Sequence, residues 1–199
     1  MSLISSISPT QIQNLTTSQI QALTTNQIIG LIDTQLAALG TAQIAGMKAS
    51  QIKAIETRDL AGLTTAQMVA LNVTQLAAFS SSQLNALSST QVAAIETADL
   101  VALSTKQIAA FSANQIAGMT TAQLSNMRPF QLMALSTDGI AAMSDAQIQS
   151  LSLAQLSALK PAQIQAMTSG QLSALGTDLI QGLTAKQIAA IETRDLAGR

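Results

Sequence analysis

Three phrases of the sequence bring two carboxylates within three residues of each other, and paired carboxylates serve in metal binding and in general acid/base chemistry. The pairs are Glu56 with Asp59, Glu96 with Asp99, and Glu192 with Asp195. The chain contains no His and no Cys that would complete a ligand set. The alternative is that Thr57, Thr97 and Thr193 cap helices that start one residue later, with the acids at the positive end of a helix dipole. We favour this structural interpretation and expect no metal site and no cofactor.

A column of glutamines recurs at every eighth position, with a few exceptions, from Gln11 to Gln187. An amide ladder of this kind would suit binding to ice, to sugar or to a neighbouring fibre. We interpret it as a series of helix caps that consumes these side chains, because Ser or Thr often precedes the Gln by three residues, as in a capping box. The hydroxyl groups of the chain have no histidine to act as their base, so we expect no catalytic residue and no enzyme.

The elements that carry these residues follow from one register: residues 8–199 form 24 consecutive octads without an insertion or deletion. We number the octad positions 1 to 8 from Ser8. Position 1 is Ser or Thr in 14 of the 24 octads, position 4 is Gln in 19, and all three prolines stand at position 2. Proline is favoured at the first helical position, so each octad is predicted to begin its own helix.

Apolar residues occupy position 5 in every octad and position 8 in every octad before the last. The spacing of Leu15 and Ile20 is that of a hydrophobic staple, which would fix the bend between successive helices. Position 7 is Ala or Gly in 21 octads, which permits close approach where consecutive helices turn past each other. Examples of the predicted core are Ile12, Leu15, Ile20, Leu23, Leu100 and Leu103.

One long helix is the rival interpretation. At about 100° per residue, an apolar stripe repeated in every octad would drift roughly 80° per octad and would soon face every direction. Helices of about six residues are unstable alone and persist only in a packed array. We therefore predict an all-α solenoid of about 24 short capped helices, with residues 1–7 as a lead-in and residues 8–199 as a single array.

Composition narrows the classes of partner. Charged residues make up 10% of the chain and the net charge is −1, so we expect no nucleic-acid partner. No apolar run reaches the length of a membrane span, and residues 1–7 lack the features of a secretory signal. The variable positions 2, 3 and 6 are mainly small and uncharged, so self-association, end to end or lateral, meets little repulsion.

One octad breaks the surface pattern, because Phe130 and Met133 occupy variable positions beside Arg128. An aromatic residue with Met and Arg is typical of an interface anchor, although Phe130 would serve equally as local packing over an adjacent octad. Ile29 and Ile32 form a second, weaker patch with the same two interpretations. These five residues are the candidate interaction patch for a protein partner.

The phrases Leu23-Thr24-Thr25-Asn26-Gln27-Ile28 and Leu63-Thr64-Thr65-Ala66-Gln67-Met68 resemble octapeptide tracts of the form LTTAQIAAL in large repetitive bacterial proteins, often adhesin-like or exported. The resemblance covers the whole array and implies a bacterial source, an extracellular or cell-surface location, and a stalk or filament. The wording is also similar to the start of the DNA-binding TAL effector repeat. The period of eight and the lack of a base-reading loop remove the reason to expect DNA recognition.

These observations leave three hypotheses open. The leading hypothesis is a non-enzymatic spacer, stalk or self-assembling filament subunit of a bacterial surface or exported assembly. The second is an α-solenoid scaffold that presents Arg128, Phe130 and Met133 to a protein or peptide. The third is an engineered, consensus-like repeat, against which Gly139 and Leu179 at position 4 indicate natural drift.

The register makes a first testable prediction at two neighbouring positions. Leu103→Asp should unfold the middle of the array cooperatively, because replacing a core Leu even by Ala costs about 2–5 kcal/mol. Thr105→Ala, at a variable position, should barely change stability. Thermal unfolding followed by circular dichroism compares the two variants, and equal melting would contradict the assigned register.

Overall fold

The computed structural model describes residues 3–197, apart from the side chains of Leu3, Ser5 and residues 192–197, and every regular element in this part is a helix. The chain divides into two compact units, unit 1 (Met1–Leu103) and unit 2 (Ser104–Arg199). The boundary falls between two octads, so both units are built on the same register. Within each unit short helices repeat regularly as a solenoid, which confirms the predicted fold class.

The helix bounds follow the octads. Unit 1 contains η1 (Leu3–Ser6), α1 (Pro9–Gln13), α2 (Thr17–Ala22), α3 (Thr25–Ile29), α4 (Asp33–Ala38), α5 (Thr41–Gly46), α6 (Ala49–Ala54), the 3-10 helix η2 (Thr57–Gly62), α7 (Thr65–Ala70), α8 (Val73–Ala78), α9 (Ser81–Ala86), α10 (Ser89–Ala93) and α11 (Thr97–Leu100). Unit 2 contains α12 (Thr105–Ile108), α13 (Ala113–Gly118), α14 (Thr121–Asn126), α15 (Pro129–Leu132), α16 (Thr137–Ala141), α17 (Asp145–Gln149), α18 (Leu153–Ala158), α19 (Pro161–Gln165), α20 (Ser169–Ala174), α21 (Thr177–Gln181) and α22 (Ala185–Ala197).

In α2 and in many other octads the helix stops at an extended residue at position 8, and the next helix starts from an extended cap at position 1. At the end of α2, Leu23 has φ −62° and ψ 135°, and the cap Thr24 has φ −73° and ψ 159°. The Leu23 amide N–H still donates to the Ile20 carbonyl at 3.1 Å. No glycine in the described part has positive φ, so a left-handed residue does not terminate these helices.

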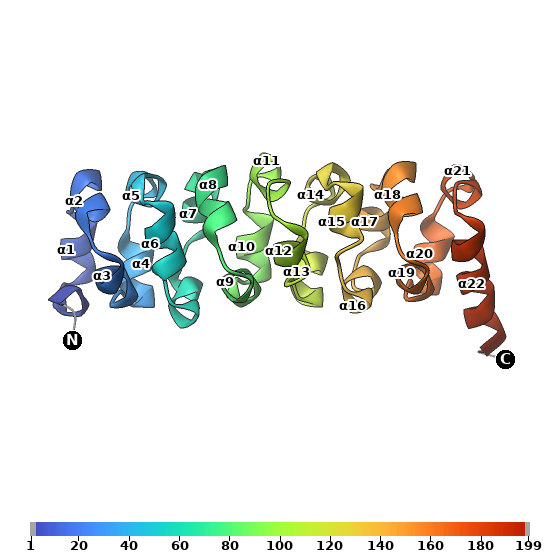
Figure 1. Cartoon of the computed structure of the whole chain (residues 1–199), viewed down its shortest axis with the longest axis horizontal. Helices are drawn as coiled ribbons and strands as arrows, with labels where there is room; N and C mark the ends of the chain where they lie inside the picture. Colours follow the sequence, from blue (N-terminus) through green and yellow to red (C-terminus); the bar gives the residue numbers. More distant parts are fainter. Residues whose placement is uncertain (1–2, 198–199) are drawn as a thin grey trace. The chain divides into compact units, whose positions relative to one another are not determined.

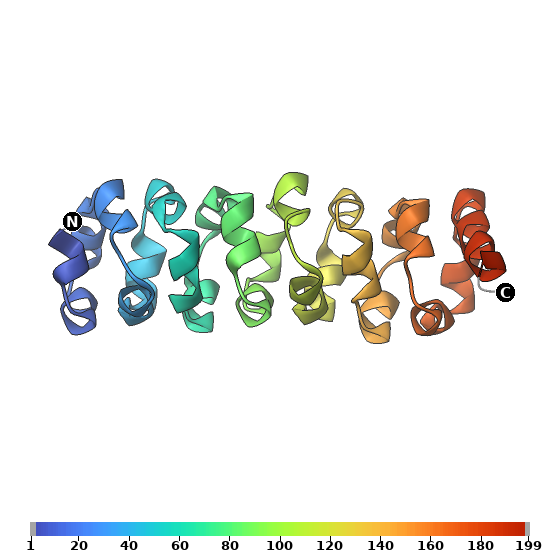
Figure 2. The same ribbon diagram turned by 90° about the horizontal axis from the view of Figure 1, so that it is seen from below.

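Helices three octads apart lie side by side in each unit, as α2 and α5 do in unit 1 and α15 and α18 do in unit 2 (Figures 1 and 2). Hydrogen bonds between neighbouring turns join residues 25, 28 and 31 positions apart. One turn therefore takes between three and four octads, and each helix lies over the junction of two helices in the turn before it.

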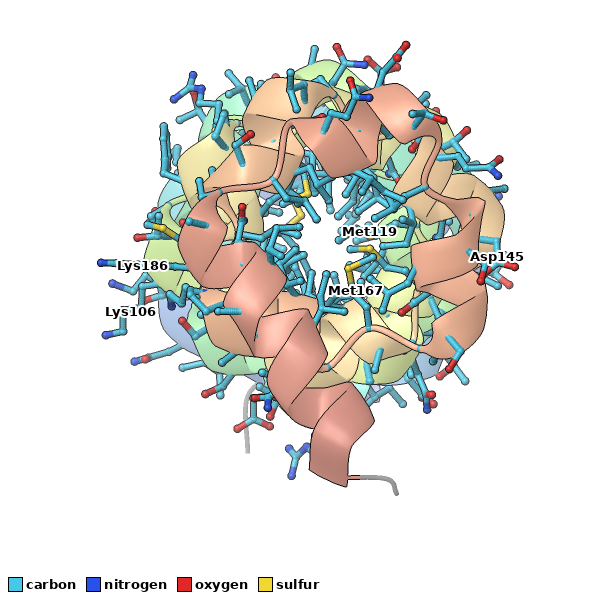
Figure 3. The ribbon with its side chains drawn as sticks, turned by 90° about the vertical axis from the view of Figure 1, so that its right-hand side faces the viewer. Lys106, Met119, Asp145, Met167 and Lys186 are labelled. Carbon is cyan, nitrogen blue, oxygen red and sulfur yellow. The ribbon has the colours of Figure 1, made fainter. Side chains whose placement is uncertain are left out.

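Positions 5 and 8 point to the axis of each unit and form its core. In unit 2, Met119 and Met167 point inward, whereas Lys106, Asp145 and Lys186 point outward (Figure 3). Ile12, Ile20, Leu100 and Leu103 are buried, as predicted. Burying an aliphatic side chain contributes about 1.5–3 kcal/mol, so the core consists of many equal and local contributions.

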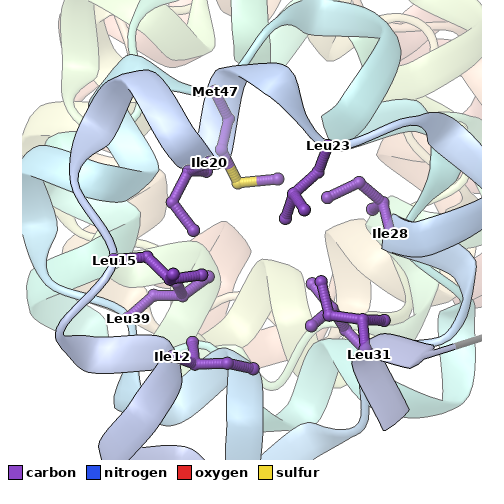
Figure 4. Close-up of a pocket in the computed structure, with 9 residues that line it drawn as sticks. Ile12, Leu15, Ile20, Leu23, Ile28, Leu31, Leu39 and Met47 are labelled. Carbon is purple, nitrogen blue, oxygen red and sulfur yellow. The ribbon is translucent and has the colours of Figure 1, made fainter. Parts of the chain in front are cut away.

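Two details of the prediction were wrong. The last two octads do not form separate helices, because α22 runs from Ala185 to Ala197 through the octad boundary. Leu15 and Leu23 are only half-buried, although both belong to the core register. They line a pocket on the axis of unit 1 together with Ile12 and Ile20 (Figure 4).

The small residues at position 7 have a different role from the predicted one. A Cβ on Gly46 would meet the Thr17 side chain, a Cβ on Gly182 would meet Leu153, and a Cβ on Gly62 would overlap the backbone of Asp33. Each contact joins position 7 of one octad to position 2 of an octad in the preceding turn. The close approach is therefore between neighbouring turns of the solenoid, and not between consecutive helices.

Gly62→Ala should lower the free energy of unfolding by about 1–3 kcal/mol, because the backbone carbonyl of Asp33 must move to admit the methyl group. Gly170→Ala is the matched control, since the nearest atoms to its Cβ are side-chain oxygens of Asp145 at 3.5 and 3.6 Å. The control should leave stability unchanged or raise it by up to about 1 kcal/mol. Urea denaturation measures both, and an unaffected Gly62→Ala variant would contradict the packing of these two turns.

Candidate functional site

The glutamine at position 4 makes the most regular polar contact of the chain. In all 19 octads that carry it, Gln Oε1 accepts a hydrogen bond from the backbone N–H of position 1. Where position 1 is Ser, Thr or Asn, its side chain accepts in return from the Gln backbone N–H, as Asn72 does from Gln75 at 3.0 Å. This arrangement is the predicted capping box.

The other end of the same amide joins two turns of the solenoid. Gln75 Nε2 donates to the carbonyl oxygens of Ile44 and Met47, both at 2.8 Å. Twelve glutamines make this pair of bonds within one unit, reaching the carbonyls 31 and 28 residues earlier at 2.8–3.3 Å and 2.5–2.9 Å. We call these twelve side chains the glutamine ladder: Gln35, Gln43, Gln51, Gln67, Gln75, Gln83, Gln91, Gln147, Gln155, Gln163, Gln171 and Gln187.

The ladder corrects the interpretation from the sequence, which assigned the glutamine side chains to the capping box alone. Each of these side chains also bonds to the preceding turn. Its side chains are at most 6% exposed. A buried amide needs partners for its oxygen and its nitrogen, and the cap and the preceding turn provide them. One signal in the sequence would have revealed the second role. A capping box accepts Glu as readily as Gln, yet position 4 is never Glu in this chain. Only an amide both accepts from the cap and donates to carbonyl oxygens.

Four octads that the structure describes lack a glutamine at position 4, and they recur as every fifth octad. The residues at position 4 are Asp59, Asp99, Gly139 and Leu179. None of these side chains carries an amide N–H, so no side-chain amide bridges the turns at these places. Gly139 leaves room that is filled by the side chain of Ile116.

The carboxylates of the first phrase contact an arginine. Arg58 forms an ion pair with Glu56, and Arg58 Nε lies 3.4 Å from an Asp59 oxygen. Among the described residues no group of three or more Asp, Glu, His or Cys comes together as a metal site. The side chains of Glu192, Thr193 and Asp195 lie outside the described residues.

The predicted caps of these phrases were wrong. Thr57 and Thr97 are the first residues of η2 and α11, and the caps are Glu56 and Glu96, which accept no side-chain cap bond. Burial raises the pKa of the Asp99 carboxyl above its ordinary value, and the charge of Glu96 adds to the rise. The stabilising contribution of protonated Asp99 is therefore complete below the ordinary pKa of about 3.9 and is lost as pH rises through the folded-state pKa.

The candidate interaction patch lies on the outside of the two units. Phe130 is 46% exposed and Met133 is 38% exposed. The Arg128 guanidinium carbon lies 5.7 Å from the centre of the Phe130 ring, within cation–π range. The helix α15 that carries these residues has no hydroxyl at its cap. Gln131 Oε1 still accepts from the backbone N–H of the cap residue Arg128 at 3.0 Å.

The other patch residues belong to unit 1, where Ile29 is 43% exposed and Ile32 is 44% exposed. Sequence reasoning did not single out four further exposed apolar side chains, which are Val69, Val73, Leu153 and Ile180. Three of them stand at the variable positions 2 and 6. An apolar residue at one of these outward positions would have indicated an exposed apolar side chain from the sequence alone. Ile180 stands at core position 5 and lines a cavity with Leu172, Leu175 and Leu183.

Substituting the ladder amide tests its second role. Gln75→Glu keeps an oxygen for the cap and turns a carboxylate oxygen toward the carbonyls of Ile44 and Met47, which should cost about 3 kcal/mol near neutral pH. Burial should raise the pKa of the introduced carboxyl, so the loss should disappear below the unfolded-state pKa of about 4.3 and grow as pH rises.

Gln19→Glu is the matched control for that change. Gln19 is exposed, and its side chain takes part only in the capping box. Gln19 Oε1 accepts from the Thr16 backbone N–H at 2.7 Å, and the Gln19 backbone N–H donates to the Thr16 hydroxyl at 3.2 Å. The control should therefore change stability by less than about 0.5 kcal/mol. Urea denaturation at several pH values compares the variants, and equal stability would show that the Nε2 bonds do not hold the turns together.

In the described part of the chain, no helix has both the length and the apolarity needed to cross a membrane. A comparison with curated proteins found no match. A comparison with protein families matched the ALTTAQ repeat over residues 52–89, 92–129 and 153–185, which is more than half of the chain. The matches fall on both units and follow the capped octads described above. The chain therefore belongs to the ALTTAQ repeat family.

Proposed function

We propose that the chain is a non-enzymatic structural protein that acts as a spacer, stalk or self-assembling filament subunit of a bacterial surface or exported assembly. The observation that carries this proposal is the glutamine ladder. Its buried amides use the oxygen for the cap and the nitrogen for the preceding turn. The most regular polar groups of the chain therefore build the array and leave nothing for a substrate.

The chemistry of the remaining groups supports the same proposal. The sequence has no His or Cys, and hydroxyl groups at position 1 accept cap bonds, as Ser80 does from Gln83 at 3.2 Å. A hydroxyl without a neighbouring base is a poor nucleophile. The exterior is soluble through hydroxyls and amides more than through charge, which suits contact between copies.

The bacterial surface location rests on the resemblance to LTTAQIAAL tracts of large exported proteins, and the family membership supports the repeat character of the chain. A stalk or spacer needs a length that can be extended by adding units. In this array each octad contacts only its neighbours and the turns beside it, so added octads extend the core without altering it.

Small-angle X-ray scattering on the purified chain, over a wide concentration series, tests the proposal. The expected result is a thin particle of constant cross-section whose mass and length increase with concentration. A compact particle of fixed mass at every concentration would contradict a filament or stalk function.

A second candidate function is a scaffold for a protein or peptide, favoured by the exposure of Phe130 and Met133 beside Arg128. Peptides selected from a display library on the wild-type chain should lose binding to a Phe130→Ser/Met133→Ser variant. Val69→Ser/Val73→Ser is the matched control, because it removes two equally exposed apolar side chains elsewhere. Loss of binding to the control alone would remove the patch from consideration.

A further inference from the structure

We infer that two copies of this chain bind each other laterally through two exposed surfaces of opposite charge. The first surface is the acidic patch of unit 1, formed by Val69, Val73, Glu96 and Asp99. The second is the basic patch of unit 2, formed by Arg128, Phe130, Met133 and Lys160. This inference rests on the proposed self-assembly and names the surfaces that meet.

Each patch is built on a pair of exposed apolar side chains. Val69 and Val73 are 49% and 44% exposed, and Phe130 and Met133 are similarly exposed. All four stand at variable positions, on the outside of the array and apart from its core. Covering such a pair with a second protein surface removes it from water, which favours association.

In unit 2, a lysine lies at the edge of the apolar pair. Position 4 of an octad bonds to carbonyls of the octad four earlier, so its cap lies over the C-terminal end of that earlier helix. Gln163 Nε2 donates to the carbonyls of Leu132 and Leu135, at 3.1 and 2.9 Å. The cap residue Lys160 therefore lies over the end of α15 that carries Met133, and Lys160 is exposed.

In unit 1, a glutamate stands at the equivalent place. Gln91 Nε2 donates to the carbonyls of Leu60 and Leu63, in the octad before α7. The next octad along the chain begins at the cap Glu96, so the same register places Glu96 over the end of α7 that carries Val69. Glu96 is exposed, and Asp99 adds a second carboxyl in the same octad.

Neighbouring helices preserve the sign of the basic patch. The octads of α12, α18 and α19, which lie beside α15, contain Lys106 and Lys160 and no acidic residue. Lys106 and Lys186 point outward on one side of unit 2, and Asp145 points outward on the opposite side (Figure 3). The positive charges of unit 2 are therefore gathered around Phe130 and Met133.

Neighbouring helices also preserve the sign of the acidic patch. The octads of α5, α10 and α11, which lie beside α7 or α8, contain Glu96 and Asp99 and no basic residue. Lys53 belongs to α6, which packs on α8 at the end away from Val73. Position 6 of one octad meets position 7 of the octad three later, as Gln21 Nε2 meets the Gly46 carbonyl at 2.8 Å, so Lys53 lies near Ala78.

The third exposed pair, Ile29 and Ile32, has no such charge. The cap four octads after Ile29 belongs to Glu56, and Arg58 forms an ion pair with Glu56. Two acidic patches repel each other and so do two basic patches, so charge selects the contact of one acidic patch with one basic patch. Because the two patches differ, one copy can offer its acidic patch to a second copy and its basic patch to a third.

The test reverses the charge of each patch in the full chain. Arg128→Glu/Lys160→Glu reverses the basic patch, and Glu96→Lys reverses the acidic one. None of these three side chains makes a cap bond, so far-UV circular dichroism should show the wild-type helix content. Lys48→Glu/Lys53→Glu is the matched control for the basic patch, because it changes the net charge equally and Lys48 is also an exposed cap without a cap bond.

Sedimentation velocity over a concentration series at low salt gives the readout. Each reversed variant should begin to associate only at about tenfold the wild-type concentration or above, since like charges then face each other. The combined variant Glu96→Lys/Arg128→Glu/Lys160→Glu should associate as the wild type does, and the control should associate at least as readily. Added salt should weaken the wild-type association, because exposed charges are screened beyond about 10 Å at 0.1 M.

Serine substitutions test the apolar half of the contact in the same assay. Val69→Ser/Val73→Ser should raise the concentration needed for association, because less apolar surface is then removed from water. Ile29→Ser/Ile32→Ser is the matched control, at two equally exposed side chains outside both patches, and it should leave association unchanged.

Two results would overturn the pairing of these patches. They are association of either reversed variant at the wild-type concentration, and failure of the combined variant to recover association. Either result would leave self-assembly through other surfaces standing. A wild-type chain that stays monomeric at every concentration would instead contradict the self-assembling function itself, so the two failures are distinguishable.

Discussion

The structure depends on one side chain that works in two directions. A helix of about six residues cannot recover its nucleation cost from its own hydrogen bonds. The ladder glutamine lowers that cost locally by accepting from the cap N–H, and it ties the same cap to carbonyls of the preceding turn, as Gln75 does. One side chain thereby couples local helix formation to turn-to-turn packing. The apolar residues at positions 5 and 8 supply the burial energy, and the amide fixes where the turns meet.

This coupling explains which departures from the pattern the array tolerates. Caps without a hydroxyl, such as Lys48 and Arg128, keep the half of the box that the glutamine provides. Position 4 lacks a glutamine at Asp59, Asp99, Gly139, Leu179 and Asp195, and no two of these octads are adjacent. At Gly139 the side chain of Ile116 fills the space. A glycine is required where position 7 meets backbone, as Gly62 meets Asp33.

The functional conclusion follows from how the polar groups are used. The amides and hydroxyls at the regular positions serve the caps and the joints between turns, and the outward positions carry small uncharged side chains. These features support the proposed structural function. The exceptions on the outside, above all Phe130 with Arg128 across its ring, are the basis of the second proposed function, a scaffold for a protein or peptide.

The sequence by itself determined the elements, because capping, proline placement and staple spacing are local effects. It predicted the octad helices, the inward positions 5 and 8, and the burial of Ile12, Ile20, Leu100 and Leu103. Tertiary structure alone decided the number of octads per turn, the acceptors of Gln Nε2, and the partner of position 7 in the preceding turn. These are contacts between turns, and an eight-residue pattern contains no information on how far apart along the chain two turns meet. For the same reason the pattern did not predict the partial burial of Leu15 and Leu23 or the continuous helix α22, since burial and bending depend on the turns packed beside a residue.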